Sequence, residues 1–160
     1  MKTIFLSFIN KEYESIGKIW LNYFIKEYSH KHNAEFSKRY GLVGRDKNFD
    51  PNSIGTYNPH FQLDTDLTQV NQLLKFIKFG FGQCMDHVCY DIRNGEMTRK
   101  EAVNLVFKYD GKCSEKYILD FCDFIGITIE NFWENVEKFR GNMWKKVDNE
   151  WINELHELLA

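Results

Sequence analysis

Apolar side chains recur at helical spacing through the second part of the chain, from Asp66 onward. Between residues 66 and 80 they share one face of a predicted helix, and that face carries Leu67, Val70, Leu74 and Ile77. Gly80 can end this helix, because glycine takes a left-handed backbone without a steric penalty. The pattern therefore predicts a helix that packs one side against a core.

A second helix is predicted over residues 82–94, with two different faces. The expected apolar face carries Met85, Val88, Cys89 and Ile92. The expected polar face carries Gln83, Asp86, His87, Tyr90, Asp91, Arg93 and Asn94. This polar face concentrates ligand-competent groups within a few helical turns.

Further helices follow, each with a recognisable beginning or end. Thr98 and Glu101 have the spacing of a capping box, and the buried stripe expected after it is Val103, Val106, Phe107 and Tyr109. Ser114 is expected to cap the next helix and Gly126 to end it, with Ile118, Phe121, Cys122 and Ile125 inside. Thr128 begins another helix with Phe132, Val136 and Phe139 on its apolar side, and residues 151–159 form a last amphipathic piece.

The first part of the chain has a different character. Residues 4–9 and 19–25 are rich in β-branched and aromatic side chains, and the second run predicts a buried strand. Ser29 is expected to cap a short helix that Gly41 ends, and residues 44–60 hold both prolines and indicate an ordered loop. The predicted fold is mainly α: a strand-bearing segment over residues 1–60, followed by a small helical bundle over residues 61–160.

Composition narrows the class of protein. The 160 residues are 43% hydrophobic and 16% aromatic, which is enough for a packed core. The net charge of -2 gives no electrostatic case for nucleic acid. The four cysteines form no C-x-x-C pair and indicate a reducing compartment. With neither a membrane-length apolar run nor a secretory signal pattern in the sequence, we expect a cytoplasmic protein without a membrane partner.

Two interpretations of the 82–94 helix remain open. Asp86, Tyr90 and Arg93 are spaced to lie along one side, with Asn94 in a neighbouring row. They form either a solvated face with an Asp–Arg pair or a face in which Arg93 grips a phosphate or carboxylate. A metal site is not predicted, because His87 and Asp91 lack a third ligand.

The glycines beside this helix have two readings as well. Gly80 and Gly82 either let the backbone approach a ligand or let neighbouring aromatic residues pack tightly. Lys78, just before them, either points at a phosphate or complements the end of its helix. Thr56 and Tyr57 lie in a polar loop that either binds an anion or forms a plain turn.

Several of these segments resemble the carboxy-terminal part of the N-acetyl sugar amidotransferases of surface-polysaccharide and flagellar-sugar synthesis. The similar segments are Ile54-Gly55-Thr56-Tyr57, residues 74–82, Asp86-His87, residues 92–102 and Lys108-Tyr109-Asp110-Gly111. The similarity covers roughly residues 19 to 147, and the block 78–102 is its most specific part.

The resemblance implies a reaction on a nucleotide-activated N-acetyl sugar, of which pseudaminic acid and O-antigen precursors are examples. In that family the acetamido oxygen is adenylated with ATP and Mg, and ammonia from a glutaminase subunit then displaces AMP to leave an acetamidino group. The resemblance would give Lys78 a catalytic role toward pyrophosphate. It would assign substrate binding to Thr56, Tyr57, Gly80, Gly82, Asp86, Arg93 and Asn94.

The sequence also departs from the family. It contains no Ser-Gly-Gly-x-Asp-Ser loop and no amino-terminal cysteine cluster, and Gln83 stands where a basic residue is expected. Residues 19–40 resemble the last strand and helix of a PP-loop α/β domain. We therefore expect the chain to be inactive alone, as a truncated product, a split subunit or a remnant, with a separate nucleotide-binding half or self-association. The alternatives are a non-catalytic helical module that binds a sugar nucleotide or a partner, and a stand-alone interaction protein.

Overall fold

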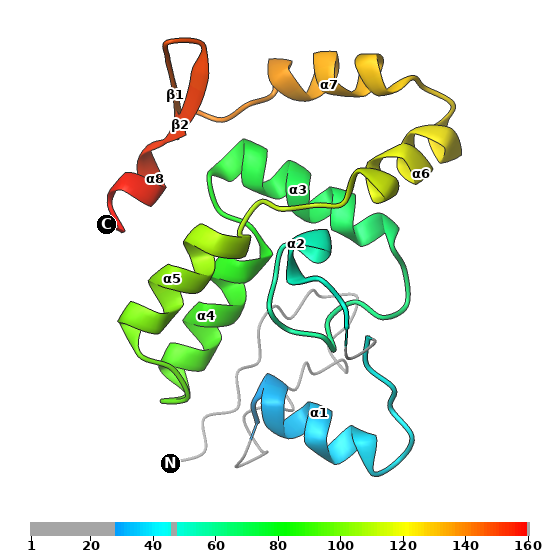
Figure 1. Cartoon of the computed structure of the whole chain (residues 1–160), viewed down its shortest axis with the longest axis vertical. Helices are drawn as coiled ribbons and strands as arrows, with labels where there is room; N and C mark the ends of the chain where they lie inside the picture. The colour runs from blue at the N-terminus through cyan, green and yellow to red at the C-terminus, as the bar shows by residue number, and fades with distance from the viewer. Residues whose placement is uncertain (1–27, 46–47, 160) are drawn as a thin grey trace, which may run out of the picture. The chain divides into compact units, whose positions relative to one another are not determined.

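The computed structural model describes residues 28–45 and 48–159, and the chain divides into two compact units, Met1–Tyr40 and Gly41–Ala160 (Figure 1). The β-branched run at residues 4–9 and the strand predicted at residues 19–25 lie outside the described residues. The domain boundary that we predicted after residue 60 falls inside the second unit.

The described part of the first unit holds one short helix, α1 (His30–Lys38). The Ser29 hydroxyl accepts a hydrogen bond from the His32 amide at 3.0 Å, and this confirms the predicted cap. Ala34 is the buried residue of this helix, and its other positions are partly or fully exposed.

The second unit is mainly helical, which confirms the predicted fold class. In chain order its described elements are α2 (Pro51–Ile54), α3 (Leu67–Phe79), α4 (Gln83–Arg93), α5 (Arg99–Tyr109), α6 (Glu115–Ile125), α7 (Ile129–Lys138), β1 (Trp144–Val147), β2 (Glu150–Asn153) and α8 (Glu154–Glu157). None of the helices in the described ranges is long and apolar enough to cross a membrane.

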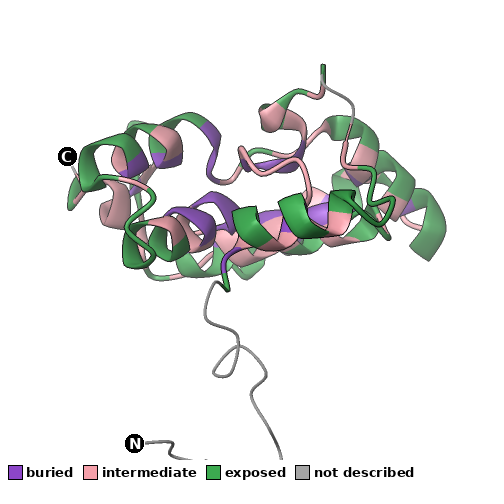
Figure 2. Cartoon of the chain, turned by 90° about the horizontal axis from the view of Figure 1, so that it is seen from below, coloured by how far each residue is buried: buried purple, intermediate pink, exposed green. Residues whose placement is uncertain are grey.

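The second unit has two apolar clusters, which Figure 2 shows as narrow buried stripes on helices whose other faces are exposed. The first joins α3, α6 and α7 and contains Val70, Leu73, Ile77, Ile118, Cys122, Phe132 and Val136. The second joins α4 and α5 and contains Cys84, Val88, Ala102, Val106 and Tyr109. The α4–α5 hairpin thus has its own cluster, and the other cluster lies between α3 and the later helices α6 and α7.

Most of the predicted helix ends agree with the structure. Thr98 and Glu101 form the capping box in full, with the Glu101 carboxylate accepting the Thr98 amide at 2.9 Å. The Thr128 hydroxyl caps α7, and Gly126 ends α6 in the left-handed region at φ +73. Ser114 precedes α6, but its side chain makes no capping hydrogen bond.

The amphipathic piece that we predicted over residues 151–159 is helical only in part, because residues 151–153 belong to a strand. Residues 144–153 form an antiparallel hairpin in which Trp144 pairs with Asn153, and helix follows only in α8. Asp148 and Asn149 connect the strands with φ of 49 and 68. Two consecutive residues with positive φ give the turn that matches the twist of a hairpin, and this local preference overrides helical periodicity.

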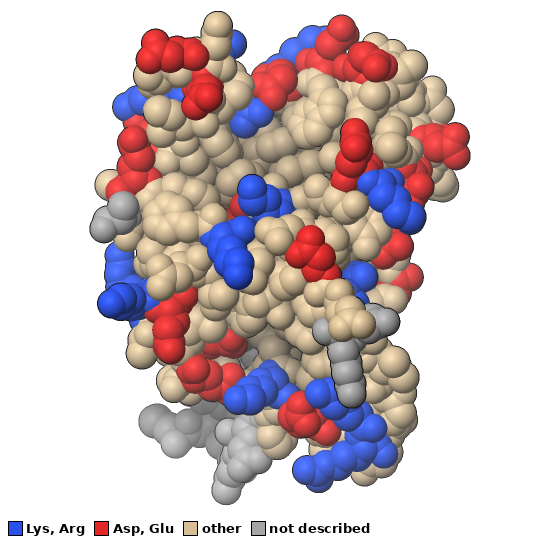
Figure 3. All heavy atoms as spheres, viewed as in Figure 1, with Lys and Arg blue, Asp and Glu red and all other residues tan. Residues whose placement is uncertain are grey.

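Three residues expected inside the bundle are exposed instead. Phe107, Ile125 and Phe139 are 48%, 46% and 72% exposed. Phe139 is the C-cap residue just beyond α7, whereas Phe107 and Ile125 lie within α5 and α6. The face of the second unit that Figure 3 shows carries both signs of charge, interspersed with uncharged surface.

Candidate functional site

The beginning of α4 is held by a buried carboxylate from the end of α5. Asp110 accepts hydrogen bonds from the amides of Gly82 at 2.8 Å, Cys84 at 2.9 Å and Met85 at 3.2 Å. Burial raises the pKa of Asp110, and the three amide donors oppose that change. Asp110 thus supplies the negative charge and the acceptors that the first turn of a helix needs.

The glycines at 80 and 82 are enclosed by protein. Gly80 has φ +81, and its carbonyl accepts the side-chain amide of Asn153 at 2.7 Å. A Cβ at Gly82 would lie 2.9 Å from a carboxylate oxygen of Asp110. Both glycines are buried, so their surroundings fit tight packing of protein segments and leave no approach for a ligand.

The face of α4 that we expected to be polar is partly buried, and this corrects the expectation for Gln83 and His87. Nδ1 of His87 lies 2.6 Å from the Thr56 hydroxyl, and Nε2 lies 2.9 Å from the Gln83 amide nitrogen. All three side chains are buried, whereas Cys89 from the expected apolar face is exposed. The polar groups are tolerated inside because they satisfy one another.

Tyr57, which follows Thr56 in the loop after α2, makes a second contact with α4 one helical turn beyond His87. Its hydroxyl donates to the Asp91 carboxylate at 2.5 Å. Burial and then Asp91 raise the pKa of Tyr57 well above its usual range. Thr56 and Tyr57 are therefore brought together with α4, as structural links between the loop and the helix.

The remaining predicted residues of α4 face other surroundings. Asp86 forms an ion pair with Lys75. Arg93 is exposed, donates from Nε to the carbonyl of Cys89 at 3.0 Å and lies over the Tyr90 ring. Asn94 is the exposed C-cap of α4, and neither Arg93 nor Asn94 lines either of the two pockets described below.

Lys78 lies on a different surface. Its ammonium is 5.3 Å from the centre of the Phe79 ring, and it borders an apolar groove of about 380 Å³ between α3, α6 and α7. The groove is otherwise lined mainly by aliphatic and aromatic side chains, including the exposed Phe139. Asp86 and Arg93 do not line this groove.

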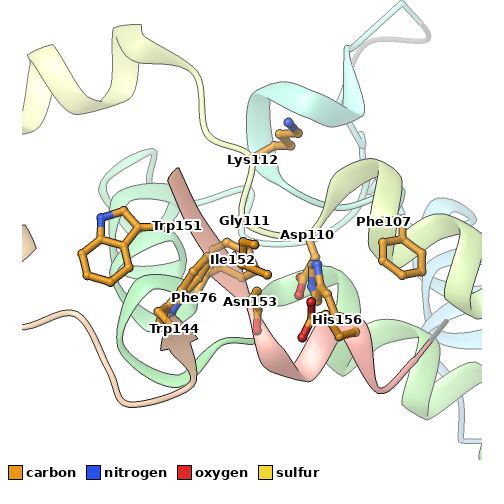
Figure 4. A pocket seen from close by; sticks show the side chains of 11 residues that line it. Phe76, Phe107, Asp110, Gly111, Lys112, Trp144, Trp151, Ile152, Asn153 and His156 are labelled. Atoms are coloured by element: carbon orange, nitrogen blue, oxygen red, sulfur yellow. The ribbon is translucent and has the colours of Figure 1, made fainter. Parts of the chain in front are cut away.

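A larger pocket of about 480 Å³ lies between the hairpin, α8 and the ends of α3 and α5 (Figure 4). Its lining combines aromatic and polar side chains: Phe76, Phe107, Asp110, Gly111, Lys112, Trp144, Trp151, Ile152, Asn153, His156 and Glu157. Ligand sites in proteins commonly have this character, with apolar walls and a few polar groups that fix orientation.

Arg140 packs against the two tryptophans of this pocket, Trp144 and Trp151. The guanidinium of Arg140 lies 4.9 Å from the Trp144 ring and 4.8 Å from the Trp151 ring. Two of its nitrogens donate to the Glu137 carboxylate, at 2.9 Å and 2.5 Å. A guanidinium fixed by a carboxylate stacks well on aromatic faces, so Arg140 attaches the hairpin to the end of α7.

Two polar atoms of the pocket residues are buried without a hydrogen-bond partner among the described residues: Nε1 of Trp144 and Nε2 of His156. Burial lowers the pKa of His156, which keeps its ring neutral at pH 7. Its Nε2 can then accept a hydrogen bond, while the Trp144 nitrogen can only donate one. No three His, Cys, Asp or Glu side chains cluster in residues 28–45 and 48–159.

Comparison with known families identifies the second unit. A family model described as LPS biosynthesis protein WbpG-like, C-terminal domain, matches residues 44–156. The chain belongs to this family. The match runs from the loop before α2 to His156 and so includes every residue of the 480 Å³ pocket except Glu157. No curated protein matches the chain.

Within this WbpG-like C-terminal domain, the sequence analysis missed the pocket residues. Trp144 lies within the range of the resemblance but in none of its similar segments, and His156 lies outside that range, because neither belongs to a recognisable motif. One signal was present in Asp110-Gly111, which the resemblance included and which the structure places in the pocket lining. The turn residues Asp148 and Asn149 could have predicted the hairpin that carries Trp144.

Proposed function

We propose that this chain is the carboxy-terminal part of an N-acetyl sugar amidotransferase in lipopolysaccharide biosynthesis. In this proposal the enzyme converts the acetamido group of a nucleotide-activated sugar to an acetamidino group. Membership of the WbpG-like C-terminal domain family supports the biosynthetic context. The observation that carries the proposal is the aromatic pocket, which gives the domain a place for a sugar.

The pocket suits a sugar in size and chemistry. A cavity of about 480 Å³ is within the range that holds small ligands in proteins. Indole and phenyl faces can cover the apolar face of a pyranose, while Asn153, Lys112 and Glu157 supply hydrogen-bond donors and acceptors for hydroxyl groups. The described domain would thus bind and orient the substrate.

The same pocket does not suit ATP with Mg. Its single lysine, Lys112, shares the lining with two carboxylates, Asp110 and Glu157, which disfavour a triphosphate. Gly80 and Gly82, the candidates for a phosphate loop, abut protein side chains. We therefore propose that ATP and the ammonia-supplying glutaminase act through parts of the enzyme other than the described residues.

A binding experiment tests the sugar site. UDP-N-acetylglucosamine is titrated into the full chain while tryptophan fluorescence is recorded, because two of the four tryptophans line the pocket. Trp151→Ala should weaken binding, since it removes one aromatic wall of the pocket. Because Arg140 also stacks on this ring, urea unfolding is used to confirm that the variant is folded. Phe124→Ala is the matched control, because Phe124 is 73% exposed and lines neither pocket.

Saturable binding that Trp151→Ala weakens and Phe124→Ala leaves unchanged supports the proposal. If the full chain does not bind the sugar nucleotide at millimolar concentration, the sugar-binding role is wrong. If it binds and Trp151→Ala has no effect, the site lies elsewhere on the domain.

The second candidate function, a non-catalytic module that docks a partner, is favoured by the apolar groove of about 380 Å³. Lys78 lies at its border, which gives the groove one positive charge beside an apolar floor. A reconstituted enzyme separates the two functions. In the catalytic proposal Lys78→Ala slows turnover more than it weakens sugar binding, whereas in the docking function it weakens assembly and leaves the turnover of the assembled enzyme unchanged.

A further inference from the structure

We infer that the apolar groove between α3, α6 and α7 binds a second copy of this chain, so that two chains form a two-fold symmetric dimer. In this dimer Phe124 of each copy enters the groove of the other copy, and Asp123 pairs with Lys78 across the interface. The inference names the partner for the docking function and rests on that second candidate function. It does not involve the sugar pocket, because the groove and the 480 Å³ pocket share no lining residue.

The first argument is the apolar surface that the groove leaves in contact with water. α6 packs against both α3 and α7, and the groove of about 380 Å³ lies where the three helices meet. Ile125 and Phe139, which line the groove, are 46% and 72% exposed. Large apolar side chains that gather around one groove are typical of an interaction site, whereas single exposed ones are ordinary surface.

The second argument is the charge of the groove. Lys78 is the only charged residue among its described lining residues. Lys138 lies at the edge that α7 forms, with its ammonium 3.4 Å from the side-chain oxygen of the lining residue Asn135. Neither lysine forms an ion pair with another described residue. The groove therefore favours an occupant that combines an apolar side chain with a carboxylate.

The third argument is that the outer side of α6 carries this combination. Phe124 is 73% exposed and does not line the groove. It follows the lining residue Phe121 by three positions, so it lies beside the groove on the helix surface. Asp123 is exposed and forms no ion pair within the described part of the chain, whereas Asp120 is engaged by Lys116 at 2.8 Å. Asp123 is thus the α6 carboxylate that is available to a lysine of another copy.

The arrangement on α6 suits two-fold symmetry. An isologous interface uses the same patch on both copies, so that patch must contain both the groove and the group that fills it. α6 supplies both, because Phe121 and Ile125 line the groove and Phe124 lies outside it. Each contact is then made twice, so one substitution removes two contacts from the dimer. Lys78 and Asp123 are both exposed, and salt should therefore weaken their pairing.

Sedimentation velocity of the full chain over a range of concentrations tests the inference. We expect wild type to dimerise with a dissociation constant below about 100 μM. Lys78→Glu and Asp123→Lys should each weaken dimerisation at least about tenfold, because each places two like-charge pairs in the interface. The double variant Lys78→Glu/Asp123→Lys restores opposite charges and should recover most of the affinity. The control is Lys100→Glu, which makes the same charge change at an exposed position of α5 outside the groove.

The apolar contacts of the interface are tested separately. Phe139→Ala removes a groove ring that is largely exposed in the single chain, and it should weaken dimerisation at least about fivefold. Phe124→Ala should have a similar effect and leave sugar-nucleotide binding unchanged. Leu158→Ala is the matched control, because Leu158 is 76% exposed and lines neither the groove nor the pocket. Circular dichroism and thermal unfolding confirm that each variant is folded.

The outcomes separate this inference from the proposed functions. Weaker dimerisation in the single variants with recovery in the double variant supports it. A wild-type chain that remains monomeric at about 100 μM refutes it, as do groove variants that act no more strongly than the controls or a double variant that dimerises no better than the single ones. If the chain is monomeric and Lys78→Ala still weakens assembly of the reconstituted enzyme, the docking function stands and the groove holds a different protein.

Discussion

Asp110 offers the sharpest test of the architecture, because one buried carboxylate joins the end of α5 to the beginning of α4. In Asp110→Asn the side chain keeps its shape but only one of its two acceptor oxygens. In its best orientation it still accepts the amides of Cys84 and Met85, while its NH₂ group faces the Gly82 amide. The variant therefore loses one charge-assisted hydrogen bond and leaves a buried donor without an acceptor.

The size of the effect follows from these contacts. A hydrogen bond to a charged group contributes roughly 1.5–3 kcal/mol, and a buried donor without an acceptor costs about 1–3 kcal/mol. Removing a buried charge recovers part of this, because burial already raises the pKa of Asp110. We expect Asp110→Asn to lower the free energy of unfolding by about 2 kcal/mol, and Asp110→Ala, which leaves three amides without acceptors, by about 4 kcal/mol.

Urea unfolding followed by circular dichroism at pH 7 measures both variants. The control is Thr128→Ala, which removes the single capping bond of the Thr128 hydroxyl to the Asn131 amide at an exposed helix start and should cost about 1 kcal/mol. If Asp110→Asn costs no more than this control, the carboxylate does not hold the beginning of α4 in the way that the hydrogen bonds indicate.

Three further predictions use the same unfolding and binding measurements. Gly111→Ala and Gly126→Ala both place a side chain at φ +73, but the new Cβ would lie 2.2 Å from the Phe76 ring in the first and would have no neighbour within 4 Å in the second. Gly111→Ala should therefore lower the free energy of unfolding by at least about 2 kcal/mol more than Gly126→Ala. Equal costs would contradict the packing of Phe76 on Gly111. The pKa of His156 in the folded chain lies below its usual 6.5, so the unfolded chain binds the proton more readily and stability falls as the pH drops below that value. Between pH 7.5 and pH 5, His156→Phe should therefore lose less unfolding free energy than wild type. An equal loss would refute the lowered pKa. Arg93→Ala should change the unfolding free energy by less than about 0.5 kcal/mol, because the side chain is exposed. It should also leave the affinity for UDP-N-acetylglucosamine unchanged. A marked loss of affinity would indicate that the α4 surface is the binding site.

The parts of the fold that the sequence predicts well are those set by neighbours in the chain. The capping box of Thr98 and Glu101 and the end of α6 at Gly126 depend on residues within one turn of each other. The periodicity of α3 likewise identified Val70 and Ile77 as core residues, and both are buried. Such features need no knowledge of what packs against them.

The buried polar side of α4 shows where this reasoning stops. Gln83 and His87 are polar, so periodicity placed them toward solvent. The structure buries both, because the Thr56 hydroxyl, from a loop far away in sequence, satisfies His87 on its other nitrogen. A residue's burial depends on whether its partner is available, and the chain does not reveal the partner by local pattern.

The sequence did not predict the candidate pocket for a related reason. The same reason gives a physical role to Gly80 and Gly82, two glycines of the segments that resemble the amidotransferases. The pocket is lined by segments from α3, the end of α5, the hairpin and α8, which no local pattern connects. Gly80 meets the Asn153 side chain of the hairpin, and Gly82 meets the carboxylate of Asp110. A Cβ at Gly82 would lie 2.9 Å from Asp110, and Gly80 combines φ +81 with a Cβ position 3.2 Å from Asn153, so both positions favour glycine where distant segments meet. Asn153 and Asp110 themselves line the pocket, so we expect substitution of either glycine to alter the proposed sugar binding through the position of the wall, without any contact between the glycine and the ligand.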